Sequence, residues 1–234
     1  MNLKAVLFDL DGTLLDIDID NFISQYFEGL SAVIARVTEC PDHRSQLLSS
    51  IHAATAAMMK AHDGETNQEV FTRVFAEESG LDLADIWSAF DDFYAQEFPT
   101  LIAHSGPMEG APEVVRLARD LSLRTAIATN PMFPRIAVLH RMNWAQISPE
   151  QVDLITTFET MKACKPHPGY FIQTAQMLGV EPQQCIMVGD DPRLDLAAAD
   201  VGMTTFFVGD SPSAVADYRG DLIDLQRLLV RLSD

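Results

Sequence analysis

Short apolar runs alternate with amphipathic segments through the C-terminal part of the chain, and this alternation restricts the fold more than any other feature. Residues 123–130, 184–191 and 203–208 have the apolar centres of buried strands, and 152–158 is a weaker example. The segments between them have the apolar spacing of helices. Strands that alternate with helices form a parallel sheet that is covered on both faces. We therefore expect an α/β fold.

A block of helical pattern interrupts this alternation near the N-terminus. Residues 4–10 form a first strand-like run, which ends in the turn signal DGT. From about residue 20 to residue 98, apolar residues recur at three- and four-residue spacings without an intervening strand pattern. We expect a Rossmann-like parallel sheet core with helices on both faces, formed by 1–16 and 100–234. An all-helical domain, 17–99, is inserted into it.

The charge of the chain argues against several classes of partner. Lys and Arg number 16 and Asp and Glu 34, so the formal net charge is −18, which leaves little basic surface for nucleic acid. No apolar run approaches the roughly 20 residues of a membrane span, and the N-terminus lacks a secretion signal. The three cysteines lack metal-ligand spacing. We expect a cytoplasmic protein that binds neither nucleic acid nor membranes; the sequence indicates no oligomeric state.

Polar side chains follow the predicted strands where each strand ends. Asp9 and Asp11 follow the first strand, Thr129 and Asn130 a second, and Asp190 with its neighbour Asp191 a third. In open parallel sheets these ends form the functional crevice. Two carboxylates about 4 Å apart repel each other by about 4 kcal/mol at an effective dielectric constant near 20. A hard divalent cation such as Mg²⁺ relieves that repulsion, so we expect a Mg²⁺ site there.

The remaining groups at this edge suit a phosphate ester. Lys165, just ahead of a predicted helix, supplies a cation, and Thr129 supplies a hydroxyl donor. A carboxylate beside a metal-bound phosphate is a possible nucleophile, and a second carboxylate two residues away can move the proton. The sequence therefore favours phosphoryl chemistry.

Four sequence motifs then carry a resemblance to a known family. They are "FDLDGTLLD" after the first strand, "TAIATN", "KACKPHPGYF" and "IMVGDDPRLDLAAADVGM". In this order they resemble the four motifs of the haloacid dehalogenase-like hydrolase superfamily, and the helical block between the first two resembles the family's cap. The chain is most similar to the phosphoglycolate phosphatase-like branch.

The resemblance implies roles for the residues of these motifs. Asp9 would be the nucleophile and Asp11 the general acid and base, with Lys165 neutralising charge between nucleophile and phosphate. Mg²⁺ would be held by Asp9, the backbone carbonyl of Asp11, and Asp190.

The other implied residues surround these. Thr129 and Asn130, with Lys165, would bind phosphate oxygens. Asp195 would be a supporting carboxylate near Lys165 or a metal-bound water. Asp191 stands where relatives often have a small polar residue, and either a helix N-cap or a supporting role suits it.

The segment between the first motif and the helical block adds three more carboxylates. Asp16, Asp18 and Asp20 alternate with Ile17 and Ile19. In an extended segment this alternation separates the carboxylates from the isoleucines. We expect the aspartates to form the wet face of a flap, with Asp16 turned toward the mouth of the site.

Three functions remain open from the sequence. The first is a Mg²⁺-dependent phosphatase that hydrolyses a small phosphorylated metabolite through an aspartyl-phosphate intermediate. The second is a phosphomutase of the sugar-phosphate type, which would pass the phosphoryl group to a phosphorylated sugar. The third is a non-catalytic phospho-aspartate switch. Asp11, which could turn over a phosphorylated Asp9, favours the first.

Overall fold

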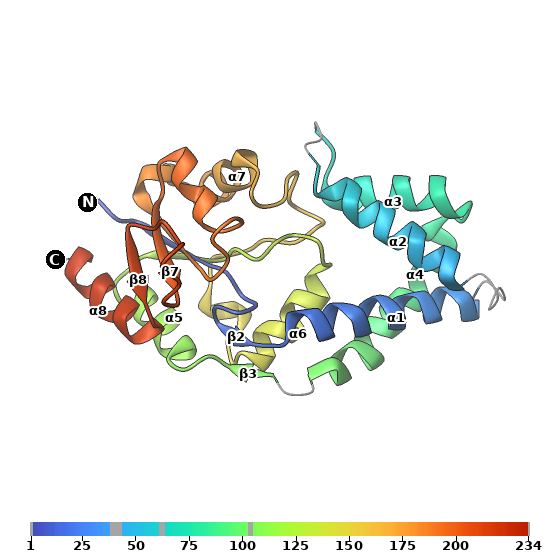
Figure 1. Cartoon of the computed structure of the whole chain (residues 1–234), viewed down its shortest axis with the longest axis horizontal. Coiled ribbons are helices and arrows are strands. Elements are labelled where there is room, and N and C mark those ends of the chain that lie inside the picture. Colours follow the sequence, from blue (N-terminus) through green and yellow to red (C-terminus); the bar gives the residue numbers. More distant parts are fainter. Residues whose placement is uncertain (1, 38–43, 61–63, 103–104, 234) are drawn as a thin grey trace.

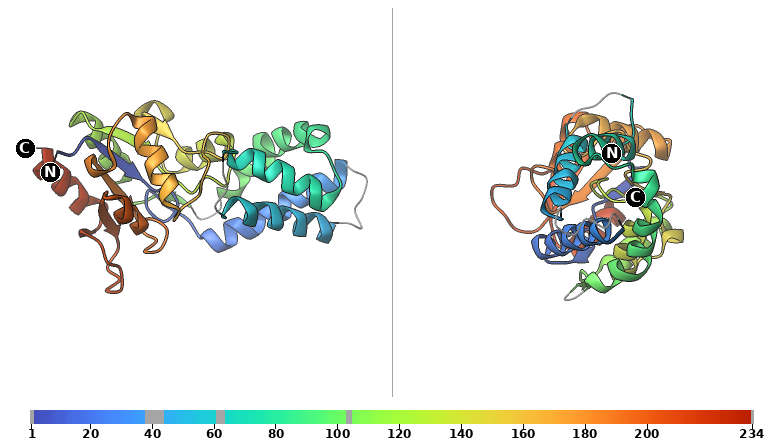
Figure 2. Two further views of the ribbon diagram at one scale, coloured as in Figure 1. Left: turned by 90° about the horizontal axis from the view of Figure 1, so that it is seen from above. Right: turned by 90° about the vertical axis from the view of Figure 1, so that its right-hand side faces the viewer.

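The computed structural model describes residues 2–37, 44–60, 64–102 and 105–233. Figure 1 shows a sheet domain that contains both termini and, beside it, a group of helices from the N-terminal half of the chain. Seen from above, the two parts lie end to end along the long axis of the molecule (Figure 2). No helix within the described ranges has the length and apolar character needed to cross a bilayer.

The sheet has six strands in the order β5-β4-β1-β6-β7-β8, all parallel to their neighbours. The first strand of the chain lies in its interior, between two strands that follow more than 110 residues later. Their registers align Phe8 with Ile127 on one side and Val188 on the other. The strands are β1 (Ala5–Phe8), β4 (Arg124–Ile127), β5 (Leu154–Ile155), β6 (Cys185–Gly189), β7 (Thr204–Val208) and β8 (Tyr218–Gly220).

Alternate residues of β1 enter the two cores on opposite faces of the sheet, as the two-residue period of a strand requires. Val6 and Phe8 belong to the larger core, together with buried residues of α5 (Ala111–Asp120), α6 (Arg135–Trp144) and α8 (Leu222–Ser233). Ala5 and Leu7 belong to the other, which includes residues of α7 (Pro168–Leu178). Helices therefore cover both faces, and the predicted α/β fold is confirmed.

The helical group comprises α1–α4 and two short irregular helices. Aromatic side chains of these helices pack on α6: Phe98 stacks on Trp144 with ring centroids 5.7 Å apart, and Phe22 meets the same ring edge-on at 6.1 Å. We retain residues 17–99 as the proposed cap. The elements are α1 (Ile19–Val37), α2 (Arg44–Met58), α3 (Asn67–Ser79), α4 (Leu83–Asp92), the π-helix η2 (Phe93–Glu97) and the 3₁₀-helix η3 (Phe98–Ile102).

A small antiparallel pair connects the two parts. Its strands are β2 (Leu15–Asp16) and β3 (Gly106–Pro107). One strand lies just before the helical group and the other just after it, so the chain leaves and re-enters the sheet domain at one place (Figure 1). This arrangement brings the start of α1 next to the end of β1.

One predicted helix takes a different form. The segment 192–202 was expected to be helical, but only Leu196–Val201 is, as the 3₁₀-helix η6. Before it, the Asp191 carboxylate accepts hydrogen bonds from the backbone N–H groups of Arg193 (2.7 Å) and Leu194 (3.0 Å). Such local side-chain bonds compete with a regular helix. Two further 3₁₀-helices are η4 (Pro149–Gln151) and η5 (Pro182–Gln184).

Candidate active site

The ends of three neighbouring strands bring the predicted residues together. Because Phe8 is level with Ile127 and Val188, Asp9 lies at the same edge as Thr129 on one side and Asp190 on the other. The Asp9 N–H donates to the Val188 carbonyl at 2.8 Å, which continues the strand pairing to Asp9.

A buried lysine connects the first and last motifs. Lys165 Nζ donates to Asp9 Oδ1 at 2.7 Å and to Asp195 Oδ1 at 2.6 Å. All three side chains are almost inaccessible to solvent. Asp195 Oδ2 also accepts from the Asp191 N–H at 3.0 Å, so both oxygens of this supporting carboxylate have partners. The arrangement holds one oxygen of Asp9 and leaves the other available.

The buried setting shifts the proton affinity of these groups. Burial raises the pKa of the Asp9 carboxyl well above its usual range, although the Lys165 ammonium acts in the opposite direction. Burial alone would lower the pKa of Lys165, but the carboxylates of Asp195 and Asp9 outweigh it and raise that pKa. Lys165 is therefore held as a cation beside Asp9.

Asn130 and Thr129 lie in the loop at the end of β4, which several hydrogen bonds hold in place. The Thr129 carbonyl accepts hydrogen bonds from the hydroxyls of Thr156 (2.8 Å) and Tyr170 (3.0 Å). Asn130 Oδ1 accepts from the Lys165 N–H at 3.1 Å. The side-chain oxygen of Asn130 thereby holds the backbone of Lys165 in place. Its amide N–H₂ is the group that could donate a hydrogen bond to an anion.

Asp190 approaches the first motif very closely. Its Oδ1 accepts from the Thr13 hydroxyl at 3.0 Å. Gly12 has a φ of +81°, and a Cβ there would lie 2.3 Å from Asp190 Oδ2. Only glycine adopts this positive φ without strain and also has no Cβ to clash with Asp190. Burial raises the pKa of Asp190 to about 6, and the charge of Asp195 adds to the shift.

These carboxylates fit a divalent cation. Among the described residues, oxygens of Asp9, Asp190 and Asp195 lie within 4.8 Å of one another. Asp195 already pairs with Lys165, so Asp9 and Asp190 are the side chains with a free oxygen. A site with two carboxylates that each have a free oxygen suits Mg²⁺, which binds oxygen ligands and takes one or two carboxylates.

The general-acid candidate has a partner that the sequence did not predict. The Arg141 guanidinium, on α6, forms an ion pair with Asp11 Oδ2 through its Nη1. Arg141 is fully buried and Asp11 is partly buried. The guanidinium carbon lies 4.3 Å from the centroid of the Phe133 ring. The relevant signal was a charged residue on the buried face of its helix, in step with Ala137 and Val138.

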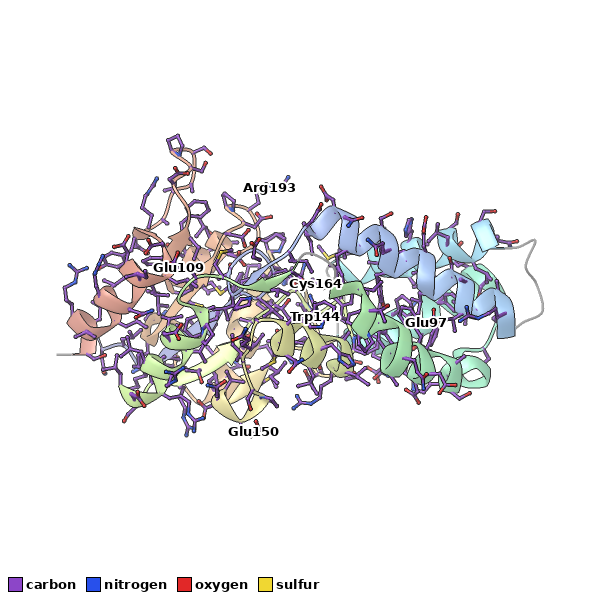
Figure 3. The ribbon with its side chains drawn as sticks, turned by 90° about the horizontal axis from the view of Figure 1, so that it is seen from below. Glu97, Glu109, Trp144, Glu150, Cys164 and Arg193 are labelled. Atoms are coloured by element: carbon purple, nitrogen blue, oxygen red, sulfur yellow. The ribbon has the colours of Figure 1, made fainter. Side chains whose placement is uncertain are left out.

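The cap contributes further residues that sequence reasoning missed. Asn67, at the start of α3, is fully buried and donates through Nδ2 to the Pro131 carbonyl at 3.0 Å and to Cys164 Sγ at 3.4 Å. Asn130 Nδ2 lies 3.7 Å from Met59 Sδ of the cap. Figure 3 labels Cys164 beside the junction of the two parts. The helical group therefore packs against the loops that carry the site.

A cavity of about 300 Å³ contains the groups described above. Its apolar wall includes Ile17, Ile19 and Ile23, at the start of α1. Asp16, Asp18 and Asp20 are exposed, as expected for a wet face. The isoleucines, rather than Asp16, line the cavity. The site residues that line it are Asp9, Asp11, Thr129, Asn130, Arg141, Lys165, Asp190, Asp191 and Asp195.

The sequence as a whole matches one family model. Residues 3–201 match the haloacid dehalogenase-like hydrolases. The chain belongs to this family. The match covers most of the sheet domain and the whole helical insert, and the predicted resemblance is confirmed.

Named relatives in the family are phosphatases. The chain is 29% identical over 202 residues to a phosphoglycolate phosphatase of Xylella fastidiosa, covering 86% of this chain and 77% of the relative. It is 25% identical over 239 residues to the N-acetylmuramic acid 6-phosphate phosphatase of Pseudomonas aeruginosa, covering 96% and 95%. These haloacid dehalogenase-like relatives extend over both parts of the molecule.

The fold has close counterparts among solved structures. The crystal structure of a haloacid dehalogenase-like phosphatase from Thermococcus onnurineus superposes with a TM-score of 0.60 and 24% identity, covering 97% of this chain and 98% of the other. The likeness therefore includes the helical insert as well as the sheet.

Proposed function

We propose that this haloacid dehalogenase-like hydrolase is a Mg²⁺-dependent phosphatase that hydrolyses a small phosphorylated metabolite through an aspartyl-phosphate at Asp9. The observation that carries the proposal is the Lys165 bridge, which fixes one oxygen of Asp9 at 2.7 Å in a side chain that lines the cavity. The named phosphatase relatives support the same reaction class.

In the first step, the free oxygen of Asp9 attacks phosphorus and the bond from phosphorus to the leaving oxygen breaks. Asp11 gives its proton to that leaving oxygen. Lys165 remains beside Asp9 and offsets the negative charge that gathers there. Thr129 and Asn130 line the same cavity and would hold the phosphate oxygens.

In the second step, Asp11 takes a proton from water, and the water oxygen attacks phosphorus. The bond from phosphorus to Asp9 then breaks, which releases inorganic phosphate and restores the carboxylate. The sum is ester plus water giving alcohol plus phosphate. The isoleucines at the start of α1 form an apolar wall of the cavity, which would limit the access of bulk water in the first step.

Asp9 and Asp190, with the backbone carbonyl of Asp11, would hold Mg²⁺. The bound ion would supply positive charge that offsets the repulsion between the two carboxylates and the phosphate. Asp195 would support the site through Lys165, and Asp191 through its N–H to Asp195. Asp191 also caps the turn before η6 through its own carboxylate.

The proposal is tested by phosphate release from an aryl phosphate and a panel of phosphomonoesters, with and without Mg²⁺. We expect turnover that needs Mg²⁺ and disappears in Asp9→Asn. The matched control is Asp20→Asn, an exposed carboxylate nine residues from Asp11, which should leave turnover unchanged. A folded protein that is inert across the panel would rule the proposal out.

The same experiment separates the two alternatives. A phosphomutase would move the phosphoryl group to a phosphorylated sugar with little release of free phosphate. A switch would keep a phosphoryl group on Asp9 for hours. Either result would replace the phosphatase assignment.

A further inference from the structure

Arg141 is a buried cation that the proposed reaction does not use. Its side chain has no solvent exposure and lines the catalytic cavity. The guanidinium lies over Phe133 and 6.0 Å from the Phe22 ring centroid. A charged group in such apolar surroundings is costly unless its hydrogen-bonding groups are satisfied. Asp11 satisfies Nη1.

The rest of this pair is unsatisfied. Arg141 Nε and Nη2 are buried and have no hydrogen-bond partner among the described residues, and the same holds for Asp11 Oδ1. Leaving such groups unpaired is unusual in proteins and calls for an explanation. The two unpaired donors lie on one edge of the Arg141 guanidinium, and the unpaired acceptor belongs to Asp11 beside it. Together they are suited to bind a ligand with complementary groups. That ligand accepts two hydrogen bonds with one group, and its leaving oxygen, once protonated, donates one to Asp11.

We propose that Arg141 determines specificity by binding a carboxylate on the leaving group, so that the substrates are small phosphorylated hydroxy acids. The carboxylate would accept from Nε and Nη2 in the bidentate geometry that a guanidinium favours. The hydroxyl released by hydrolysis would donate to Asp11 Oδ1. The inference rests on the proposed phosphatase reaction and adds the substrate class.

The positions of Lys165 and Arg141 support separate roles for the two cations, one at the phosphate and one at the leaving group. Lys165 contacts Asp9 and Asp195, whereas Arg141 contacts Asp11, the proposed general acid. The transferred phosphoryl group belongs beside Lys165, and Arg141 is left for the remainder of the substrate. A neutral polyol would offer hydroxyls in place of the planar acceptor. The cavity, at about 300 Å³, is at the small end of ligand sites.

The first experiment compares two substrates of nearly equal size in the wild-type protein. They are 2-phosphoglycolate and 2-hydroxyethyl phosphate, which has a hydroxymethyl group in place of the carboxylate. We expect kcat/KM to favour the acid by at least about 30-fold, because charge-assisted hydrogen bonds would be lost with the neutral ester. A ratio near one would overturn the inference. Hydrolysis of the neutral ester or an aryl phosphate would leave the proposed function standing.

The second experiment uses Arg141→Gln and Arg141→Lys, with Arg135→Gln on the exposed side of the same helix as the matched control. We expect the preference for the acid to fall at least about tenfold in both variants, mainly through KM. The control should keep it. If Arg141 only positions Asp11, both substrates lose kcat equally and the preference is unchanged, which would overturn the proposal. If Arg141→Gln does not fold, Arg141→Lys and the wild-type ratio of kcat/KM for the two substrates still test the inference.

Discussion

Lys165 Nζ donates to Asp9 Oδ1 at 2.7 Å across 156 residues of sequence. The same ammonium binds Asp195 at 2.6 Å, so a single cation separates two buried carboxylates. Coulomb attraction is strong in such a buried setting, and so is the cost of removing one partner. This contact therefore contributes to stability as well as to the proposed chemistry.

Replacing Lys165 by Met should abolish turnover and lower the free energy of unfolding by about 3 kcal/mol or more, since buried carboxylates lose their counter-charge. The deficit should grow with pH. Burial already raises the pKa of the Asp9 carboxyl above its unfolded value, and loss of the cation that opposes this shift raises it further. The contribution of Asp9 to stability is therefore present at low pH and lost as pH rises. Urea unfolding at pH 5 and pH 8 measures this.

The control for that variant is Lys162→Met, three residues away and exposed. It should change stability little at either pH, as surface substitutions usually do. An equal deficit at both pH values in Lys165→Met would contradict the electrostatic account.

The approach of Gly12 to Asp190 gives a second prediction. Gly12→Ala would force an alanine to a φ of +81° and place its Cβ 2.3 Å from Asp190 Oδ2. Asp190 must then move, and we expect Mg²⁺ affinity to fall about 10- to 100-fold, as for other changes that displace a metal ligand. Titration calorimetry with Mg²⁺ measures the change.

Gly179→Ala is a control that separates the effect of backbone strain from the effect of displacing Asp190. Gly179 has a similar φ of +71°, but a Cβ there meets nothing within 4 Å. This control should cost about 1–2 kcal/mol of stability from the left-handed backbone alone. Its Mg²⁺ affinity should stay at the wild-type value. A matching loss of affinity in both variants would refute the role of the close approach.

The sheet was predictable because its strands are buried on both faces. Such strands are nearly continuous apolar runs, and helices of clear period separate them. β8 was missed for the same reason: Tyr218 and Arg219 are exposed and the strand lies at the edge of the sheet, so no apolar run marks it.

The candidate site was predictable where its residues follow strands or belong to motifs. Arg141 and Asn67 follow neither rule. Arg141 is fixed by an ion pair to a residue 130 positions away, and Asn67 by contacts 64 and 97 positions away. Only the tertiary structure brings these partners together. The buried-face position of Arg141 was visible in the helix period, but its partner was not.

The raised pKa of Asp190 leads to a prediction about pH. Its folded-state pKa of about 6 exceeds the ordinary value of 3.8. In the metal-free protein, its favourable contribution is therefore present below pH 3.8 and lost as pH rises through 6. Mg²⁺ needs the ionised carboxylate. We expect the rise in Tm caused by Mg²⁺ to be small at pH 5 and large at pH 8.

Thermal unfolding at fixed Mg²⁺ concentration provides the measurement. Asp190→Asn is the reference, because it removes the titrating group and should show little Mg²⁺ effect at either pH. The same rise in Tm at pH 5 and pH 8 in the wild-type protein would show that Asp190 does not control metal binding in this range.

The docking of the cap through Asn67 gives the last prediction. Asn67 is fully buried, and its Nδ2 donates to a carbonyl and a thiol of the loops around the site. In Asn67→Ala the Pro131 carbonyl loses a buried donor, which should lower stability by about 1–3 kcal/mol. The cap should also open more often, so kcat/KM should fall and proteolysis between the two parts should accelerate. Glu78→Ala, an exposed change on the same helix, should alter neither quantity. A lower stability with unchanged kcat/KM and unchanged proteolysis would mean that Asn67 stabilises the fold without holding the cap closed.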